Sequence, residues 1–205
     1  LEPEVAHQIS LIALKLGFHP RLKRIEIPVK INNLHFTNFL GVAAGFDKNA
    51  QIIERIHYLN FGLTEVGTIT PLPQYGNPKP RVFRLVEDKA IINRNGFNNL
   101  GMAQAIKKLK NYRKKFPVGS DFILGVNIGP NKDSNDRFND YEILSKNLSE
   151  FADYLTINIS SPNTPNLRDF HQTNNLKKVL ISVKNGIAKS KSCLLYTSPS
   201  PRDRV

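Results

Sequence analysis

The sequence predicts an α/β protein built around a parallel sheet, because short apolar segments alternate with helical segments along its 205 residues. Each of the four apolar segments ends in a cluster of small or polar residues, as strands do at the carboxyl end of a (β/α)8 (TIM) barrel. No glycine-rich dinucleotide loop follows any of them, which disfavours the alternative, a doubly wound sheet. A complete barrel needs about 250 residues, so we expect its first half here.

The first predicted element is a helix over residues 3–16. Pro3 suits the first turn, Glu4 complements the positive end of the helix dipole, and Gly17 is a natural stop. We assign residues 1–27 to an N-terminal helical extension, and we expect native sequence upstream because position 1 is not Met. The segment IPVKINNLHFTN then alternates around Asn32 and Asn33, which predicts a tight hairpin.

The strand–helix units are predicted within residues 28–191. Strands are expected at residues 40–45, 63–68, 121–129 and 154–159, and their helices at residues 50–59, 98–110, 140–151 and 174–188. A second hairpin, residues 81–93, precedes the helix at 98. The remaining residues, 192–205, are rich in Ser, Pro and Arg without a period. We expect this tail to be non-native and to form no further strand and helix.

The composition is that of a soluble globular protein, with 40% hydrophobic and 22% charged residues. No apolar run approaches the ~18 residues that span a membrane, and the acidic first residues do not form a signal peptide. Cys193 is the only cysteine, which favours a reducing compartment. The net charge of +12 favours acidic partners. We interpret the basic run at residues 107–116 as a solvated helix face, with nucleic-acid or lipid binding as the alternative.

The strand-end clusters supply the candidate functional residues. In AAGFDKN, Ala44 and Gly45 would let a flat ligand approach the backbone, and Lys48 suits a carboxylate or phosphate. A Gly–Asp turn with an exposed lysine is the alternative. Thr68 in EVGTITP offers a hydroxyl just past its strand, although such a residue more often caps a strand end.

Asparagine residues recur near these strand ends. Asn93 in INRNGFNNLG directly follows an apolar pair, and a neutral amide suits an imide-like ring because it both donates and accepts hydrogen bonds. Asn127 and Asn158 each interrupt an apolar strand, where an unpaired amide is costly. Their repetition on successive strands predicts a shared ligand, with internal hydrogen bonding as the alternative.

Ser161 lies two residues beyond a predicted strand end, in SSPNTP. It does not belong to a G-x-S-x-G elbow, and no histidine or lysine base is near it in sequence, so it is a poor nucleophile. It would instead accept or relay a proton if a water chain and an electron-withdrawing cofactor assisted it.

Five motifs in order resemble the class 2, quinone-dependent dihydroorotate dehydrogenases over residues 2–191: GVAAGFDKNA, EVGTITPLPQYGNPKPRVFRL, INRNGFNNLG, GVNIGPNKD and NISSPNTPNLR. The resemblance implies an FMN-dependent barrel enzyme that oxidises dihydroorotate to orotate in pyrimidine (UMP) biosynthesis and reduces a membrane quinone. It also implies peripheral attachment to the cytoplasmic side of an inner-type membrane, with no metal and no nucleic acid. A related FMN oxidoreductase acting on another pyrimidine is the nearer alternative.

The resemblance also assigns roles to residues. Flavin would be held by Ala44, Gly45, Phe46, Asp47, Lys48, Thr68, Asn127 and Asn158. Dihydroorotate would be held by Lys48, Asn93, Arg94, Asn95, Gly96, Phe97, Asn158 and Asn163. Ser161 would be the catalytic base that removes the C5 proton while hydride leaves C6. His7 and Arg84 would lie on the quinone side, with simple surface roles as the alternative.

Class 2 is favoured over class 1 because class 1 enzymes use a cysteine base and lack the helical extension, whereas no cysteine here precedes position 193. Pro130 stands where the family usually has lysine, so the sequence departs there from the family pattern of a cation at that point. The resemblance implies that the second half of the barrel and the first extension helix are missing. We therefore expect the isolated chain to be inactive and to bind flavin poorly.

Overall fold

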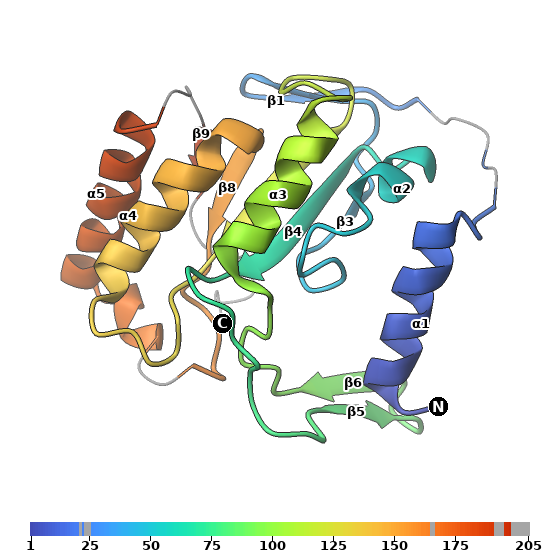
Figure 1. Ribbon diagram of the computed structural model, residues 1–205, viewed down its shortest axis with the longest axis horizontal. Coiled ribbons are helices and arrows are strands. Elements are labelled where there is room, and N and C mark those ends of the chain that lie inside the picture. The colour runs from blue at the N-terminus through green and yellow to red at the C-terminus, as the bar shows by residue number, and fades with distance from the viewer. Residues whose placement is uncertain (21, 23–25, 165–166, 191–194, 198–205) are drawn as a thin grey trace.

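The computed structural model describes residues 1–20, 22, 26–164, 167–190 and 195–197 (Figure 1). Helices alternate with strands over most of this part of the chain. The helices are α1 (Pro3–Leu16), α2 (Ile53–Tyr58), α3 (Gly101–Arg113), α4 (Arg137–Leu148), α5 (Thr173–Ala188) and the 3-10 helices η1 (Ser149–Phe151) and η2 (Leu167–His171). The strands are β1 (Val29–Ile31), β2 (Leu34–Phe36), β3 (Gly41–Val42), β4 (Leu63–Ile69), β5 (Val82–Leu85), β6 (Ala90–Asn93), β7 (Ile123–Ile128), β8 (Tyr154–Ile157) and β9 (Leu195–Thr197).

The central sheet has five strands in the order β3-β4-β7-β8-β9, and every pair of neighbours is parallel. Leu63 of β4 pairs with Ile123 of β7, and Gly125 of β7 pairs with Tyr154 of β8. The strands of this sheet therefore lie side by side in the order in which they occur along the chain. All six residues of β7 are buried, as expected for a central parallel strand covered on both faces. The predicted parallel α/β fold is therefore confirmed.

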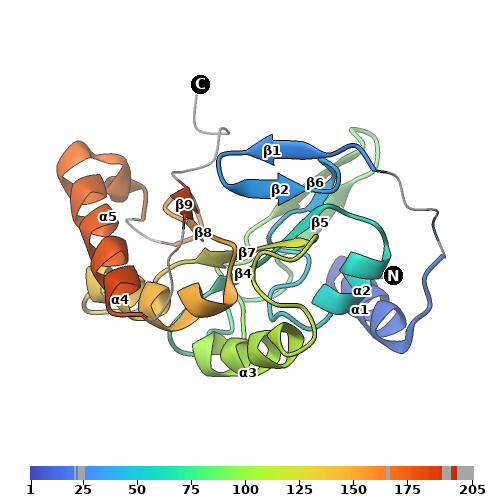
Figure 2. The same cartoon turned by 90° about the horizontal axis from the view of Figure 1, so that it is seen from above.

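Helices α3, α4 and α5 lie side by side along the outside of the sheet (Figures 1 and 2). Helices α4 and α5 pack closely at Gly186, where an added Cβ would lie 2.4 Å from the carbonyl oxygen of Glu142. The core between sheet and helices is formed by buried aliphatic side chains such as Val66, Leu109, Leu124, Val126, Leu144, Leu155, Val179 and Val183. This packing leaves the carboxyl ends of the strands free to carry polar groups.

The two antiparallel hairpins lie at opposite ends of the sheet (Figures 1 and 2). The β1–β2 hairpin turns at Asn32, whose φ of 53° is the left-handed conformation that asparagine tolerates, and it lies near the starts of the strands. The β5–β6 hairpin lies at their carboxyl ends, next to α1. Both hairpins form where the sequence predicts them.

Helix α1 spans the predicted residues, and its ends show why. The Glu2 side chain accepts hydrogen bonds from the backbone N–H groups of Glu4 and Val5, and Gly17 ends the helix at a φ of 89°. Its apolar stripe faces outward, because Val5, Ile9, Ile12 and Leu16 are 46–68% exposed. In α1 only Leu11 is fully buried.

Three elements differ from the prediction. The strand expected at residues 40–45 is only Gly41–Val42, because the chain then turns to place Asp47 under α2. Helix α3 begins at Gly101 rather than residue 98, since the Asn99 carboxamide accepts from the N–H of Gly101 at 2.8 Å. Leu195–Thr197 form β9 beside β8, although no strand was expected there. The rest of the predicted tail, 192–205, lies outside the described residues.

The basic run belongs to α3 and the turn after it. Leu109 and Tyr112 are buried in the core, and the Arg113 side chain, only 7% exposed, donates to Asp153 at 2.7 Å. Lys115 forms a more exposed ion pair with Glu54 at 3.1 Å. The run therefore forms one buried helix face and one solvated face, as the sequence interpretation expects.

Candidate functional site

A cleft of about 810 Å³ opens at the carboxyl ends of β4, β7 and β8 and beside the loops after β3 and β6. Parallel strands bring their ends to one edge of the sheet, so residues far apart in the sequence meet here. Of the predicted site residues, the cleft is lined by Ala44, Gly45, Lys48, Thr68, Asn93, Asn95, Gly96, Phe97, Asn127, Asn158, Ser161 and Asn163.

The cleft wall is a network of short polar contacts between three strand ends. The Thr68 hydroxyl donates to Oδ1 of Asn127 at 2.6 Å. Nδ2 of Asn158 donates to Oγ1 of Thr68 at 2.9 Å and to Oδ1 of Asn127 at 3.2 Å. The internal hydrogen bonding that the sequence left as an alternative is thus present, and the same side chains also line the cleft.

Glu65 extends this network into the interior and was missed at the sequence level. Its carboxylate accepts from Nδ2 of Asn127 at 2.8 Å, from the hydroxyl of Thr156 at 2.8 Å and from that of Tyr154 at 3.1 Å. All four side chains line the cleft. The available signal was an acidic residue in the middle of an apolar strand, which requires several partners when it is buried.

Lys48 is the cation that the loop after β3 brings to the cleft. The loop is held to the end of β4 because the N–H of Gly45 donates to the carbonyl of Gly67 at 2.9 Å, and the N–H of Gly67 donates to the carbonyl of Asp47 at 3.1 Å. Burial lowers the pKa of Lys48, and the nearby Arg81 lowers it further, whereas Glu4 raises it. Lys48 is therefore poised to gain from an anionic ligand that would stabilise its charge.

The loop at residues 93–97 forms another wall. The N–H of Asn77 donates to the carbonyl of Asn95 at 3.0 Å, and Nε2 of Gln74 donates to the carbonyl of Gly96 at 2.9 Å. The side-chain oxygens Oδ1 of Asn95 and Oδ1 of Asn98 are buried without a hydrogen-bond partner. Asn95 and Asn98 line the cleft, and these two oxygens are the polar atoms of the loop that the protein leaves unpaired.

Ser161 and Asn163 lie in the loop after β8, on the cleft. The Ser161 hydroxyl oxygen accepts from the backbone N–H of Asn163 at 3.3 Å. Arg168, which the sequence analysis did not select, also lines the cleft from η2. The site thus combines hydroxyl groups with cations and amides.

Five predicted residues lie outside the cleft lining. The buried Asp47 caps the turn before α2, because its carboxylate accepts from the N–H groups of Gln51 and Ile52, each at 2.8 Å. The Arg94 guanidinium donates to the carbonyl of Pro80, and that of Arg84 donates to the carbonyl of Leu1. Nε2 of His7 lies 2.7 Å from the carbonyl oxygen of Phe46, and the two rings pack edge to face.

Comparison with known proteins agrees with this geometry. A sequence model of the family described as dihydroorotate dehydrogenase matches residues 26–201. The chain is 47% identical over 193 residues to a dihydroorotate dehydrogenase (quinone) of Bartonella tribocorum, covering 93% of this chain and 51% of that protein. It is 47% identical over 184 residues to the mitochondrial dihydroorotate dehydrogenase (quinone) of Cyclocybe aegerita, covering 89% of this chain and 55% of that protein. The chain spans about half the length of the curated relatives it matches.

Solved structures show the same relationship. The ferulenol complex of DHODH from Eimeria tenella superposes with a TM-score of 0.86 at 41% sequence identity, covering 91% of this chain and 51% of that one. The ligand-free DHODH from the same organism also superposes with a TM-score of 0.86 at 41% sequence identity, covering 93% of this chain and 55% of that one. The described sheet and helices correspond to part of a (β/α)8 barrel, and the chain belongs to the dihydroorotate dehydrogenase family.

Proposed function

We propose that the protein containing this chain oxidises dihydroorotate to orotate in pyrimidine biosynthesis, with FMN accepting the hydride and a membrane quinone receiving the electrons. The observation that carries the proposal is the convergence of Lys48, Asn127, Asn158 and Ser161 on one cleft. The pyrimidine substrate has a carboxylate, ring N–H groups and carbonyls, and a cation with several amides complements all of these.

The cleft fits a flavin on structural grounds. Nothing lies within 4 Å of the position that a Cβ would take on Gly45, so the backbone there is open to a flat ring. Thr68, Asn127 and Asn158 offer hydroxyl and amide groups along the same wall. The bound FMN would supply the hydride acceptor, and the side chains would hold it and exclude water from it.

Each cleft residue then has a defined task. Lys48 would pair with the substrate carboxylate, while Asn93 and Asn163 would hydrogen-bond to the ring. Ser161 would accept the proton from C5 while its own hydroxyl proton passes through a water chain to solvent, and the loop after β8 would set its distance from that carbon. Phe46 and Asp47 would support the loop that carries Lys48, and Arg94 would support the loop at residues 93–97 through its contact with Pro80.

The test uses the complete open reading frame that contains this chain, expressed as one protein. We expect FMN in the purified protein, quinone-dependent oxidation of dihydroorotate, and rescue of a pyrimidine auxotroph. Dihydrouracil lacks the carboxylate that Lys48 would recognise, so it should be a poor substrate. Oxidation of dihydrouracil in preference to dihydroorotate would instead favour the alternative of an oxidoreductase for another pyrimidine.

Helix α1 supports the proposal of peripheral attachment to the cytoplasmic side of an inner-type membrane, where a quinone would be reached. Its exposed stripe of Val5, Ile9, Ile12 and Leu16 is the kind of face that inserts at a bilayer surface. No helix among the described residues is long and apolar enough to cross a bilayer. The quinone side would be formed here, near His7 and Arg84.

Vesicle sedimentation tests this attachment. We expect Ile12→Asp to reduce sedimentation of the complete protein with anionic vesicles, because it puts a charge in the apolar stripe. Ser10→Asp is the matched control, since the Ser10 hydroxyl lies outside the stripe and donates to the carbonyl of Ala6. Equal sedimentation of both variants and the wild type would contradict the attachment through α1.

A further inference from the structure

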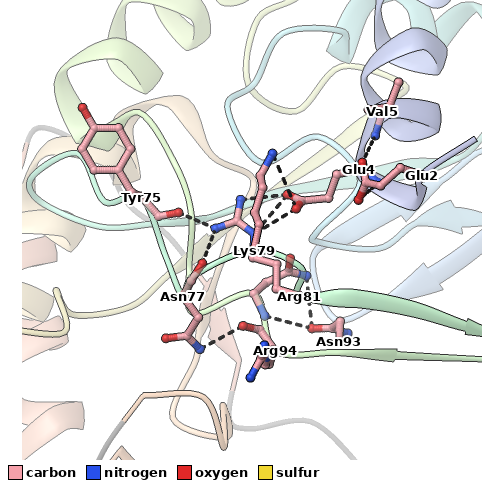
Figure 3. Close-up of polar contacts among 10 residues, drawn as sticks. Glu2, Glu4, Val5, Tyr75, Asn77, Lys79, Arg81, Asn93 and Arg94 are labelled. Carbon is pink, nitrogen blue, oxygen red and sulfur yellow. Dashed lines mark hydrogen bonds and ion pairs between the residues drawn. The ribbon is translucent and has the colours of Figure 1, made fainter.

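Helix α1 lies outside the cleft, and it contacts the loop that carries Lys48 and the segment before β5 that contains Arg81. In Figure 3, Glu4 in its first turn points at Arg81. Nη2 of Arg81 donates to Oε1 of Glu4 at 2.8 Å, and Nε lies 3.1 and 3.2 Å from the two carboxylate oxygens. His7, one turn further along, contacts the carbonyl of Phe46, which is two residues before Lys48. The helix therefore braces the loop of Lys48 and the segment that contains Arg81.

Arg81 is a buried cation with several fixed partners. Only 6% of the residue is exposed, and Nη1 donates to the carbonyl oxygens of Tyr75 and Asn77. Gly76 lies between these two residues at a φ of +78°, and a Cβ there would lie 2.8 Å from Nη1 of Arg81. The guanidinium thus holds the turn at residues 75–77 at a distance that glycine permits.

The turn at residues 75–77 in turn holds the cleft loop at residues 93–97. The N–H of Asn77 donates to the carbonyl of Asn95 at 3.0 Å, and a Cβ on Gly76 would lie 2.2 Å from the same carbonyl oxygen. Nδ2 of Asn77 donates to the carbonyl of Arg94 at 2.9 Å, as Figure 3 shows. A continuous series of contacts therefore runs from Glu4 through Arg81 and the turn to Asn95 in the cleft wall.

We propose that Glu4 and Arg81 are positioning residues that set where the cleft loop at residues 93–97 lies relative to the substrate. The inference rests on the proposed function and goes beyond it, because neither residue lines the cleft. A buried guanidinium needs its counter-charge, so loss of the Glu4 carboxylate would release Arg81 and loosen the turn. Docking of α1 and occupancy of the cleft then favour each other by thermodynamic linkage.

The same two residues act on Lys48 in opposite directions. Burial lowers the pKa of Lys48, the Arg81 charge lowers it further, and the Glu4 charge raises it. Both groups face Lys48 from outside its own loop, Glu4 from α1 and Arg81 from the segment before β5. Removing either residue should loosen the turn at residues 75–77. Removing Glu4 should lower the pKa of Lys48, whereas removing Arg81 should raise it.

The experiment compares Glu4→Gln and Arg81→Gln with the wild type in the complete protein. We expect both variants to raise the KM for dihydroorotate and the Kd for orotate about 10-fold, with kcat changed about 2-fold or less. The matched control is Glu54→Gln, which breaks the more exposed ion pair to Lys115 on another face and should leave both constants unchanged. A soluble dye replaces the quinone as electron acceptor, so that effects on the quinone side do not enter.

The pH dependence of orotate binding separates positioning from general loosening. Binding weakens as Lys48 loses its proton, so the alkaline loss of affinity follows the pKa of Lys48. Glu4→Gln should move this loss to lower pH, and Arg81→Gln should move it to higher pH. If the substitutions only disturbed the local structure, the pH at which orotate affinity is lost would not change in either variant.

Amide hydrogen exchange supplies a readout that does not depend on the proposed function. In Glu4→Gln, the N–H groups of Asn77 and Arg94 should exchange about 10-fold faster than in the wild type or in Glu54→Gln. If Glu4→Gln does not fold, Glu4→Asp keeps the charge, shortens the reach and should show the same direction. Unchanged exchange with unchanged KM overturns the positioning role. A wild type that fails to oxidise dihydroorotate overturns the proposed function instead, and exchange alone then decides whether the brace exists.

Discussion

Asn127 shows how a polar side chain is tolerated inside an apolar strand. Its amide nitrogen donates to Glu65, and its amide oxygen accepts from Thr68 and from Asn158. Each buried group is therefore satisfied by a neighbour, which removes the penalty for burying an unpaired amide. The network also fixes the directions of the side chains before any ligand arrives, and such preorganisation lowers the entropic cost of binding.

Ser161 is the residue on which the proposed proton transfer depends. We expect Ser161→Ala to slow reduction of the flavin by dihydroorotate about 10²–10⁴-fold, because the group that accepts the C5 proton is lost. The Kd for orotate should change little, since no proton moves on binding. Anaerobic stopped-flow absorbance measures the rate.

Ser160→Ala is the matched control for this prediction. Oγ of Ser160 lies 3.4 Å from Oδ1 of Asn158 and has a supporting position, so its removal should slow the reaction far less. Equal losses in the two variants would contradict a specific role for Ser161 as the base.

At the scale of elements, α3 is fixed to the barrel by a buried ion pair at its C-terminal end. The Asp153 carboxylate accepts from Arg113 at 2.7 Å and from the N–H groups of Gly119 and Leu124, each at 2.8 Å. Asp153→Ala would leave the buried Arg113 guanidinium without its counter-charge, although its carbonyl partners remain, and would remove the acceptor of two backbone N–H groups. We expect it to lower the free energy of unfolding by about 3–5 kcal/mol, measured by urea denaturation.

The Glu54–Lys115 ion pair can be compared with the Arg113–Asp153 pair, because it also joins a carboxylate to a cation but is more exposed to solvent. Its lysine is 62% and its glutamate 34% exposed, so solvent screens the attraction. Glu54→Gln should lower the free energy of unfolding by about 0–1 kcal/mol. Equal effects of the two substitutions would show that the Arg113–Asp153 contact does not depend on burial.

Gly186 governs how closely α4 and α5 pack. Replacing a helical glycine with alanine ordinarily stabilises a helix by about 0.5–1 kcal/mol. Here the Cβ would lie 2.0 Å from Oγ of Ser145 and 2.4 Å from the carbonyl oxygen of Glu142. We therefore expect Gly186→Ala to destabilise the protein by about 1–3 kcal/mol in urea denaturation.

A second substitution tests whether this overpacking is the cause. Ser145→Ala combined with Gly186→Ala removes the hydroxyl clash but leaves the backbone carbonyl of Glu142. The double variant should recover only part of the lost stability. If the Gly186→Ala variant unfolded at a higher urea concentration than the wild type, α4 and α5 would be able to move apart without loss of stability.

At the scale of the whole molecule, the described sheet is open. Its order begins at β3 and ends at β9, so one edge of each of these strands has no partner among the described strands. Apolar side chains such as Phe39, Leu40 and Ile31 are also more than half exposed. Unpaired parallel edges and exposed apolar surface favour association with other chains.

We therefore expect the isolated 205-residue chain to self-associate and to bind FMN weakly. Light scattering after size exclusion measures its mass, and absorbance of the purified protein measures its flavin content. The complete protein, prepared in the same way, is the control. A monomeric chain that carries stoichiometric flavin and reduces quinone would contradict this expectation.

Much of the fold could be predicted because local patterns encode it. The apolar periodicity and end residues of α1 and the alternation around Asn32 are properties of neighbouring residues, and the structure confirms both elements. Boundaries were less certain where a distant contact decides them. Helix α3, for example, starts where the Asn99 side chain, which also contacts Thr70, accepts from the N–H of Gly101.

The candidate site was predicted through residues at strand ends, and most of them line one cleft. Glu65 was missed because its role depends on partners from three strands. Asp47 was assigned to flavin binding, and its carboxylate caps a turn, so only its backbone remains for a ligand; the direction of a side chain in a loop is set by the hydrogen bonds it finds. The Glu4–Arg81 contact joins residues 77 positions apart and has no local signature.

The sequence by itself determined the alternation of strands and helices, the polar residues at the strand ends and the family to which the chain belongs. These follow from periodicity and from motifs, which depend on residues close together in the chain. Only the tertiary structure decided which side chains face the cleft, which satisfy each other, and how α1 reaches the loops around Lys48 and Arg81. The physical reason is that hydrogen bonds and ion pairs act over a few ångströms, so they are defined only when the fold has brought their partners together.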